Sequence, residues 1–247
     1  MRCHSLLLLR YSRTPRYREA MSLRLFPKPP ADASRESTIP AAMLVLASFA
    51  LYWLLPGHFR PVPALLMIVL VVVLVTLLVV FVPNRHAGVA HWQRSLVMIV
   101  IAAITLSNAY DLVRLIETLL SKNQPLTGRE LILSAAVIWL TNVVVFGLWY
   151  WELDRGGPGS RAAARDDATQ SRFPDFQFPQ MENPQLAPSE WHPRLLDYIY
   201  FSFSNGTAFS ATDVMPLSHW AKLLMMVQAG SSLLLVVLVT ARAVNVL

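Results

Sequence analysis

Segments without charged side chains recur along this chain, and several are long enough to cross a lipid bilayer. The clearest runs from Ala64 to Val82, nineteen residues of which only Thr76 is polar. At 1.5 Å per residue such a helix spans about 28 Å, close to the roughly 30 Å hydrocarbon core of a membrane. Because lipid offers the backbone no hydrogen bonds, we expect these segments to be helices.

The composition points away from a soluble enzyme. Apolar residues make up 55% of the 247 residues and charged residues 15%, whereas about a quarter of a soluble domain is charged. We therefore predict an all-α membrane protein, a polytopic helical bundle of five to six transmembrane helices. The expected transmembrane segments are 41–55, 64–82, 95–120, 131–151, 195–211 and 220–246.

The same pattern divides the chain into four regions. They are a basic N-terminal arm (1–39), a four-helix transmembrane bundle (40–152), a polar linker rich in proline (153–193) and a C-terminal unit (194–247). The linker is too polar to span a membrane. Its aromatic residues Phe173, Phe176, Phe178 and Trp191 are expected to hold its second half against the bundle or a membrane surface.

The N-terminal arm predicts the orientation of the chain. Eight of the 21 basic residues precede the first apolar segment, against three acidic residues: Arg2, Arg10, Arg13, Arg16, Arg18, Arg24, Lys28 and Arg35. Such an arm favours contact with anionic lipid over nucleic acid, and it predicts a cytoplasmic N-terminus in a multi-pass protein of the cell inner (plasma) membrane. Met21 is an alternative start, so residues 1–20 receive no structural role.

The C-terminal unit has two possible arrangements. Four crossings return the chain to the cytoplasmic side before residue 153. If residues 195–211 then cross, six crossings leave both ends inside, in agreement with the positive-inside rule, and we favour this arrangement. The alternative is a re-entrant pore-like segment that enters and leaves on one side.

Four polar side chains within the expected spans are candidates for function. Asp111, Arg114 and Glu117 follow one another at intervals of three residues, which predicts one shared face on which they pair. That face is either the solvated side of a protruding helix or a polar surface inside the bundle. Asn142 is expected to point inward, where another helix supplies a partner.

The C-terminal unit resembles the pore module of the voltage-gated-type potassium channel superfamily. The residues that carry the resemblance are Tyr200-Phe201-Ser202-Phe203, the segment Thr207 to Asp213, Pro216-Leu217 and Lys222-Leu223-Leu224. The whole chain also resembles a family of uncharacterised bacterial integral membrane proteins with a pore-like C-terminus. The resemblance implies a pore helix, a filter that ends in aspartate, and an inner helix. It places Thr207, Phe209, Ser210, Thr212 and Asp213 in the pore-like segment.

The filter segment differs from Thr-Val-Gly-Tyr-Gly-Asp, the filter sequence of that superfamily. Aligned at Asp213, Ser210 and Thr212 take the glycine positions, and Ala211 takes the position of the tyrosine. Left-handed backbone costs a residue other than glycine roughly 1–2 kcal/mol, in every subunit. A potassium-selective filter is therefore not expected. The hydroxyl groups of Thr207, Ser210 and Thr212 either line a less selective path or satisfy buried backbone groups.

No catalytic, nucleotide-binding or metal-binding motif is present, so we predict that the chain is neither an enzyme nor dependent on a cofactor. Three functions remain as hypotheses. The first is a channel-like protein that conducts monovalent ions as a homo-oligomer in the lipid bilayer. The second is a non-conducting membrane scaffold or accessory subunit, and the third is a small-molecule transporter that uses Asn142 with Asp111 and Arg114.

Overall fold

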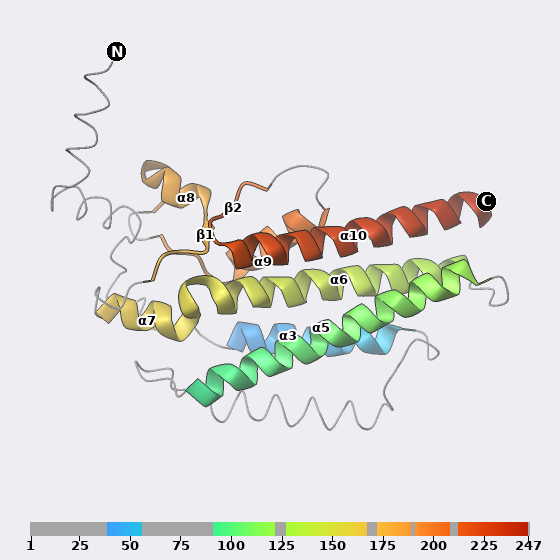
Figure 1. The fold of residues 1–247 in the computed structure, drawn as a ribbon, viewed down its shortest axis with the longest axis horizontal. Coiled ribbons are helices and arrows are strands. Elements are labelled where there is room, and N and C mark those ends of the chain that lie inside the picture. The colour runs from blue at the N-terminus through green and yellow to red at the C-terminus, as the bar shows by residue number, and fades with distance from the viewer. Residues whose placement is uncertain are drawn as a thin grey trace, which may run out of the picture.

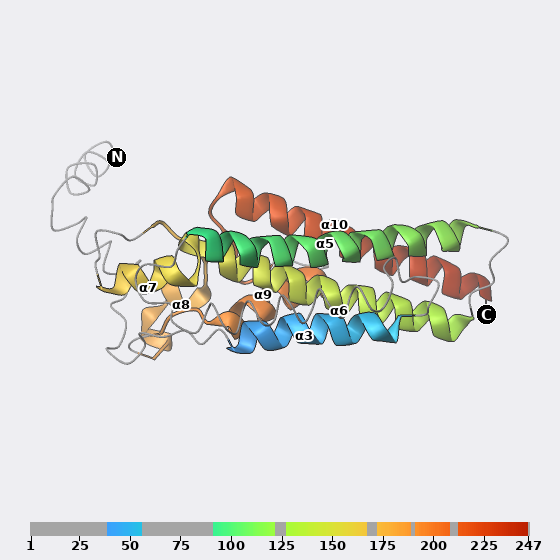
Figure 2. The ribbon, with the colours of Figure 1, turned by 90° about the horizontal axis from the view of Figure 1, so that it is seen from below.

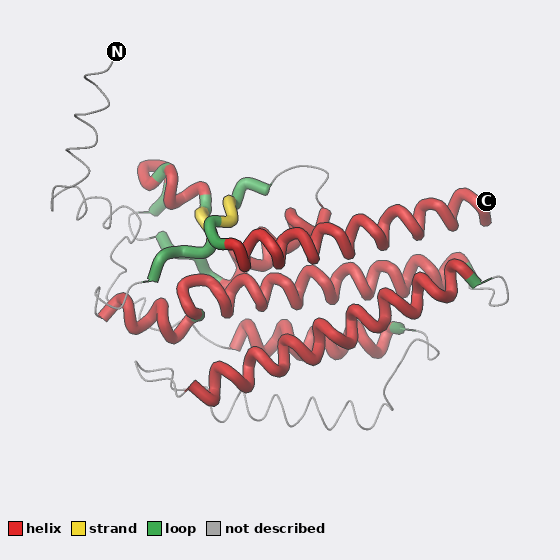
Figure 3. Tube along the Cα trace, viewed as in Figure 1, coloured by secondary structure: helices red, strands yellow, loops and turns green. Residues whose placement is uncertain are grey.

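The structure is a computed structural model, and it describes residues 39–55, 91–121, 127–166, 172–188, 191–207 and 212–246. These residues form helices with two very short strands (Figures 1 and 3). The elements are α3 (Ile39–Leu54), α5 (His91–Leu120), α6 (Gly128–Leu153), η2 (Asp154–Gly156), α7 (Pro158–Asp166), β1 (Phe176–Gln177), α8 (Pro179–Glu182), η4 (Pro184–Leu186), α9 (Leu195–Thr207), β2 (Met215–Pro216) and α10 (His219–Val246).

Three of these helices are long and apolar enough to cross a membrane: Arg94–Leu120, Gly128–Arg161 and His219–Arg242. The apolar part of α3, Pro40–Leu54, is shorter. These lengths fit a helical membrane protein, as the uncharged segments of the sequence predict. The predicted span 64–82 lies outside the described residues.

Helix α6 is the centre of the bundle. It contacts α3, α5, α9 and α10, and 61% of its most apolar stretch is buried, against 17% for α10. Its start is fixed by a capping box in which the hydroxyl of Thr127 accepts the Glu130 N–H and the Glu130 carboxylate accepts the Thr127 N–H. Figure 2 shows α3, α5, α6 and α10 side by side along the long axis of the molecule.

Of the predicted span 195–211, the structure describes residues 195–207, and residues 208–211 lie outside the described residues. Helix α9 runs antiparallel to α6 and ends at Thr207, where the Trp139 indole N–H of α6 donates to the Gly206 carbonyl at 3.2 Å. Trp139 lies about midway along α6. The chain is next described at Thr212, and β2 pairs with β1 of the linker, whose Phe176 stacks on Tyr150 near the C-terminal end of α6.

The chain therefore enters the bundle at the C-terminal end of α6 and is back at that end before α10 begins. We call the described residues 195–207 and 212–216 the re-entrant segment. The physical reason for the return is that β2 finds hydrogen-bond partners in β1, so that Phe176 pairs with Pro216 and Gln177 with Met215. The described residues favour the re-entrant arrangement, and whether the segment crosses a membrane stays a prediction.

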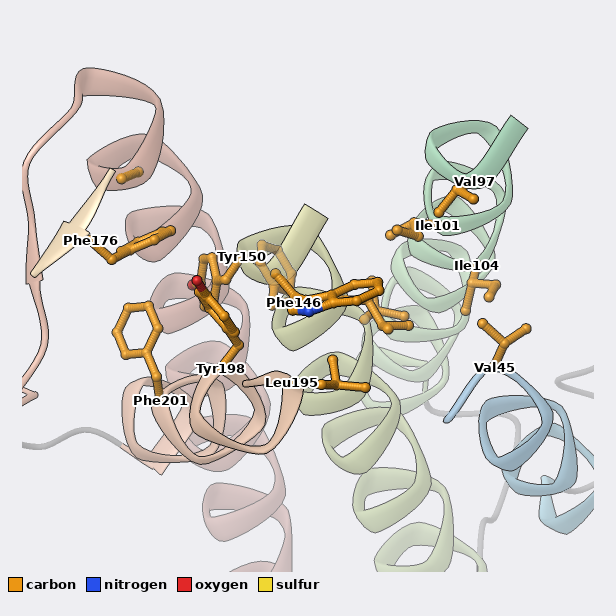
Figure 4. Packing of buried hydrophobic residues seen from close by; sticks show 14 of the residues in the cluster. Val45, Val97, Ile101, Ile104, Phe146, Tyr150, Phe176, Leu195, Tyr198 and Phe201 are labelled. Atoms are coloured by element: carbon orange, nitrogen blue, oxygen red, sulfur yellow. The ribbon is translucent and has the colours of Figure 1, made fainter. Parts of the chain in front are cut away.

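Aromatic rings fill the core around the first turns of α9. Tyr150, Phe176 and Phe201 meet with ring centroids 4.6–5.1 Å apart, and Phe178 packs edge-on against Tyr198. Figure 4 shows Tyr150 on α6, Tyr198 and Phe201 on α9, and Phe176 on β1, and Phe178 comes directly after β1 in the chain. The linker is thus anchored by Phe176 and Phe178, both buried, whereas Phe173 is 82% exposed.

A glycine permits the close approach of α6 and α9. A Cβ atom added at Gly147 would collide with the Ile199 side chain and lie 3.2 Å from the Ile199 Cα. We expect Gly147→Ala to destabilise the protein by about 1–3 kcal/mol, because the two helices must move apart. Thermal unfolding in detergent measures the change.

Gly230 provides the matched control for that substitution. It lies on an exposed part of α10 with no atom within 4 Å of an added Cβ. Gly230→Ala should leave stability unchanged or raise it by up to about 1 kcal/mol, through helix propensity. Equal effects of the two substitutions would show that contact between α6 and α9 does not limit the size of residue 147.

Candidate functional site

A buried polar cluster joins α6, α9 and α10 at the level of the re-entrant segment. Its members are Tyr150, Ser202, Asn205 and Gln228, and we call it the insertion network. The Tyr150 hydroxyl and the Asn205 amide donate to the Gln228 side-chain oxygen at 2.6 and 2.8 Å. The Gln228 amide donates to the Ser202 carbonyl and hydroxyl oxygens at 2.9 and 2.7 Å.

The insertion network extends to the backbone of the helices on either side. The Ser202 hydroxyl donates to the Val143 carbonyl of α6 at 2.7 Å, and the Asn205 amide donates to the Met225 carbonyl of α10 at 3.2 Å. Gln228 and Ser202 have no exposed surface. Burying a polar group without a hydrogen bond costs free energy. These hydrogen bonds therefore fix how deeply α9 lies between α6 and α10.

Asn142 adds a second bridge between α6 and α10. Its amide donates to the Ser231 hydroxyl at 2.7 Å, and Ser231 donates to the Gln228 carbonyl at 2.9 Å. Asn142 is 5% exposed, which is the inward orientation that the sequence predicts. The bonds tie α6 to α10, so the residue holds helices together in this structure.

Asp154 fixes the point at which α9 enters the bundle. The residue is fully buried, and its carboxylate accepts the Tyr198 hydroxyl at 2.6 Å and the Asp175 N–H at 2.8 Å. The Asp175 carbonyl in turn accepts the Leu217 N–H at 2.8 Å. One carboxylate thus connects the end of α6 to the beginning of α9 and, through Asp175, to the residue that follows β2.

The turn around Asp154 depends on left-handed backbone. Arg155, Gly156 and Gly157 have φ angles of 53°, 81° and 91°, and a Cβ atom at Gly157 would lie 2.8 Å from the Glu152 carbonyl oxygen. After the turn, Arg161 folds back and donates to the carbonyls of Trp151 and Asp154 at 2.8 and 2.9 Å. The helix end is therefore capped by a buried cation, which satisfies carbonyls that α6 leaves without a partner.

The residues predicted to form the filter are only partly described. Thr207 is exposed, and its hydroxyl donates to the Phe203 and Ser204 carbonyls of its own helix at 3.1 and 3.0 Å. The Thr212 hydroxyl donates to the Val214 carbonyl at 2.9 Å, and Asp213 is exposed. Phe209 and Ser210 lie outside the described residues.

The charged triplet of α5 does not share one face. Arg114 pairs with Glu117 at 2.9 Å on the exposed side, whereas Asp111 is 4% exposed and faces the interior. The reason is helix geometry, because six residues rotate by about 600°, which is about 120° short of two whole turns, so Glu117 cannot share the face of Asp111. The proposed pairing of Asp111 with Arg114 is therefore replaced by the pair Arg114–Glu117.

Sequence reasoning missed most of the residues that hold the re-entrant segment. Gln228, Asn205 and Asp154 were not candidates, although Gln228 interrupts an otherwise apolar stretch of the last span. That interruption is the same signal that selected Asn142. Within the described ranges no group of three His, Cys, Asp or Glu side chains can hold a metal ion.

No protein-family model, curated protein or solved structure matches this chain. The function proposed for the chain therefore rests on the geometry of α6, α9 and α10.

Proposed function

We propose that this chain is a channel-like membrane protein that conducts monovalent ions without selecting potassium, as a homo-oligomer. The observation that carries the proposal is the re-entrant segment: a helix reaches the middle of α6, and the chain returns to the end where it entered. Backbone outside a helix is tolerated at membrane depth only where protein buries it or where it lines an aqueous path. The exposed Thr207 stands at the deep end of α9.

The rigid support of α9 agrees with this function. A conducting segment must hold its lining groups at fixed positions, because each group replaces part of the hydration shell of the ion. The insertion network and Asp154 fix α9 along its length through hydrogen bonds of 2.6–3.3 Å. Nothing comparable is needed for a helix that serves only as a lipid anchor.

The homo-oligomer follows from the size of one re-entrant segment, which cannot enclose a path alone. Helices α9 and α10 offer a broad apolar surface for a second copy. Its most exposed members on the two helices are Leu196, Tyr200, Phe203, Trp220, Leu223, Met226, Val227, Leu233, Leu234 and Val237. In this arrangement part of that surface contacts neighbouring copies and the rest contacts lipid.

Ion flux into liposomes tests the proposal. Purified protein should carry sodium and potassium at similar rates, and Thr207→Trp should abolish the flux because a bulky ring at the deep end of α9 obstructs the path. Thr240→Trp is the matched control, since Thr240 is an exposed threonine whose hydroxyl also bonds to its own helix. The control should conduct like the unmodified protein.

Two results would contradict the proposal. The first is the absence of flux from protein that unfolds cooperatively and is inserted in the vesicles, which would favour a scaffold or accessory subunit. The second is flux that Thr207→Trp and Thr240→Trp reduce equally.

A further inference from the structure

A small cavity of about 40 Å³ lies between α3, α5 and α6, away from the re-entrant segment. A buried water needs roughly 10–15 Å³ of such space, so the cavity holds two or three particles of that size. Three helices contribute the polar groups that line it: Ser48, Ser107, Asn108, Asp111 and Thr141. Asp111 is the only acidic or basic side chain among the described residues of the lining.

The sequence spacing shows that α5 and α3 each turn one face toward the cavity. Helix α5 contributes Ala103 together with Ile104, Ser107, Asn108 and Asp111, and the last four follow the i, i+3, i+4, i+7 pattern of a single helix face. Helix α3 contributes Ser48, Phe49 and Tyr52, with Leu55 just after its end, and α6 contributes Val137, Ile138 and Thr141. The cavity therefore lies where faces of these three helices meet.

The charge of Asp111 has no counterpart within the described part of the chain. Its side chain is buried, and its Oδ1 atom has no hydrogen-bond partner there. The nearest cation in sequence on α5, Arg114, is bonded to Glu117 on the exposed side. The predicted span 64–82 contains no charged residue either. A buried carboxylate in an apolar bundle requires either a cation or a proton.

We propose that the cavity binds a small monovalent cation, of the size and hardness of sodium. Carboxylate, hydroxyl and amide oxygens are the ligands that hard cations prefer. Asp111 supplies the charge, and Asn108, Thr141 and Ser48 supply neutral oxygens around it. The Ser48 hydroxyl donates to the Leu44 carbonyl at 3.0 Å, which leaves its oxygen able to accept a cation.

Charge balance selects a monovalent ion over a divalent one. One carboxylate and one monovalent cation leave the cavity neutral, whereas a divalent ion would leave an uncompensated charge among apolar side chains. Calcium and magnesium sites in proteins also use more than one carboxylate as a rule, or additional waters and phosphates. The site shares α6 with the proposed conducting path, but no residue of α9 or α10 lines it.

Thermal unfolding of the full chain in detergent tests the proposal, with N-methyl-D-glucamine replacing sodium at constant ionic strength. A ligand that binds only the folded state stabilises it in proportion to the logarithm of its concentration. The Tm should rise by about 3 °C or more when sodium reaches ten times its dissociation constant. Asp111→Asn should unfold cooperatively and lose the sodium dependence, because a neutral amide needs no cation.

Two further variants keep the result interpretable. Glu117→Gln removes an exposed carboxylate of the same helix and should retain the full response to sodium. Thr141→Val preserves the shape of the side chain and removes one oxygen, so the rise in Tm should require a several-fold higher sodium concentration. This variant tests the proposal even if Asp111→Asn fails to fold. A Tm that does not depend on sodium in the unmodified protein would overturn the proposal and indicate a protonated Asp111. Sodium dependence that persists in Asp111→Asn would also overturn it.

Discussion

Gln228→Leu should destabilise the protein by about 3 kcal/mol, which corresponds to a fall in Tm of roughly 6–12 °C for a chain of this length. Gln228 is fully buried and takes part in four of the hydrogen bonds that join α6, α9 and α10. Leucine fills nearly the same volume, but it strands the Tyr150 hydroxyl and removes the nearest of the three acceptors of the Asn205 amide. Each stranded donor costs about 1–3 kcal/mol.

A double-mutant cycle with Tyr150→Phe isolates the hydrogen bond from the packing. Phenylalanine removes the hydroxyl that Gln228→Leu strands, so the double variant should be more stable than the sum of the single effects predicts, by about 1–2 kcal/mol. Met226→Leu, on the exposed side of the same helix, should change stability by less than about 0.5 kcal/mol. Strict additivity in the cycle would argue that Tyr150 and Gln228 do not interact.

The long helices could be predicted from sequence because their signal is local. An uncharged stretch of sufficient length has no alternative to a helix in lipid, and the expected bounds 131–151 and 220–246 differ from α6 and α10 by a few residues. The capping residues Thr127 and Glu130 explain why α6 begins before its apolar stretch.

The course of the C-terminal unit could be predicted only as one of two alternatives. An apolar helix that crosses and one that ends midway have similar composition over residues 195–207, so composition cannot separate them. In the described residues the chain returns to the C-terminal end of α6 through the pairing of β2 with β1, residues almost forty positions earlier in the chain. Such long-range pairings leave no periodic signal in either segment.

For the buried polar residues, the sequence predicts the orientation of a single side chain but not the partner that it bonds to. The cost of an amide in lipid is enough to predict that Asn142 points inward. Its partner Ser231 lies 89 residues away, and no feature of the sequence identifies it. Asp154 was assigned to a polar linker because glycines and prolines follow it, although the fold buries it completely.

Asp154→Ala should be at least as damaging as the loss of Gln228, at about 3–5 kcal/mol. The substitution leaves the buried Tyr198 hydroxyl and the Asp175 N–H without their acceptor. It also removes the carboxylate that lies 3.8 Å from the Arg155 guanidinium. Asp154→Asn retains one acceptor oxygen, so we expect it to lower the free energy of unfolding by about half as much as Asp154→Ala does. Asp213→Asn, at an exposed position of the re-entrant segment, is the control and should be nearly neutral.

Hydrogen exchange separates the local consequence of Asp154→Ala from general destabilisation. The Asp154 carboxylate holds Asp175, and the carbonyl of Asp175 holds the Leu217 N–H just before α10 begins. Exchange at Leu217 should therefore accelerate in Asp154→Ala at temperatures where the middle of α6 remains protected. Uniform acceleration along α6 and α10 would contradict this coupling. Unchanged exchange at Leu217 would show that β1 and β2 hold the returning chain without Asp154, and that the entry and exit of the re-entrant segment are fixed separately.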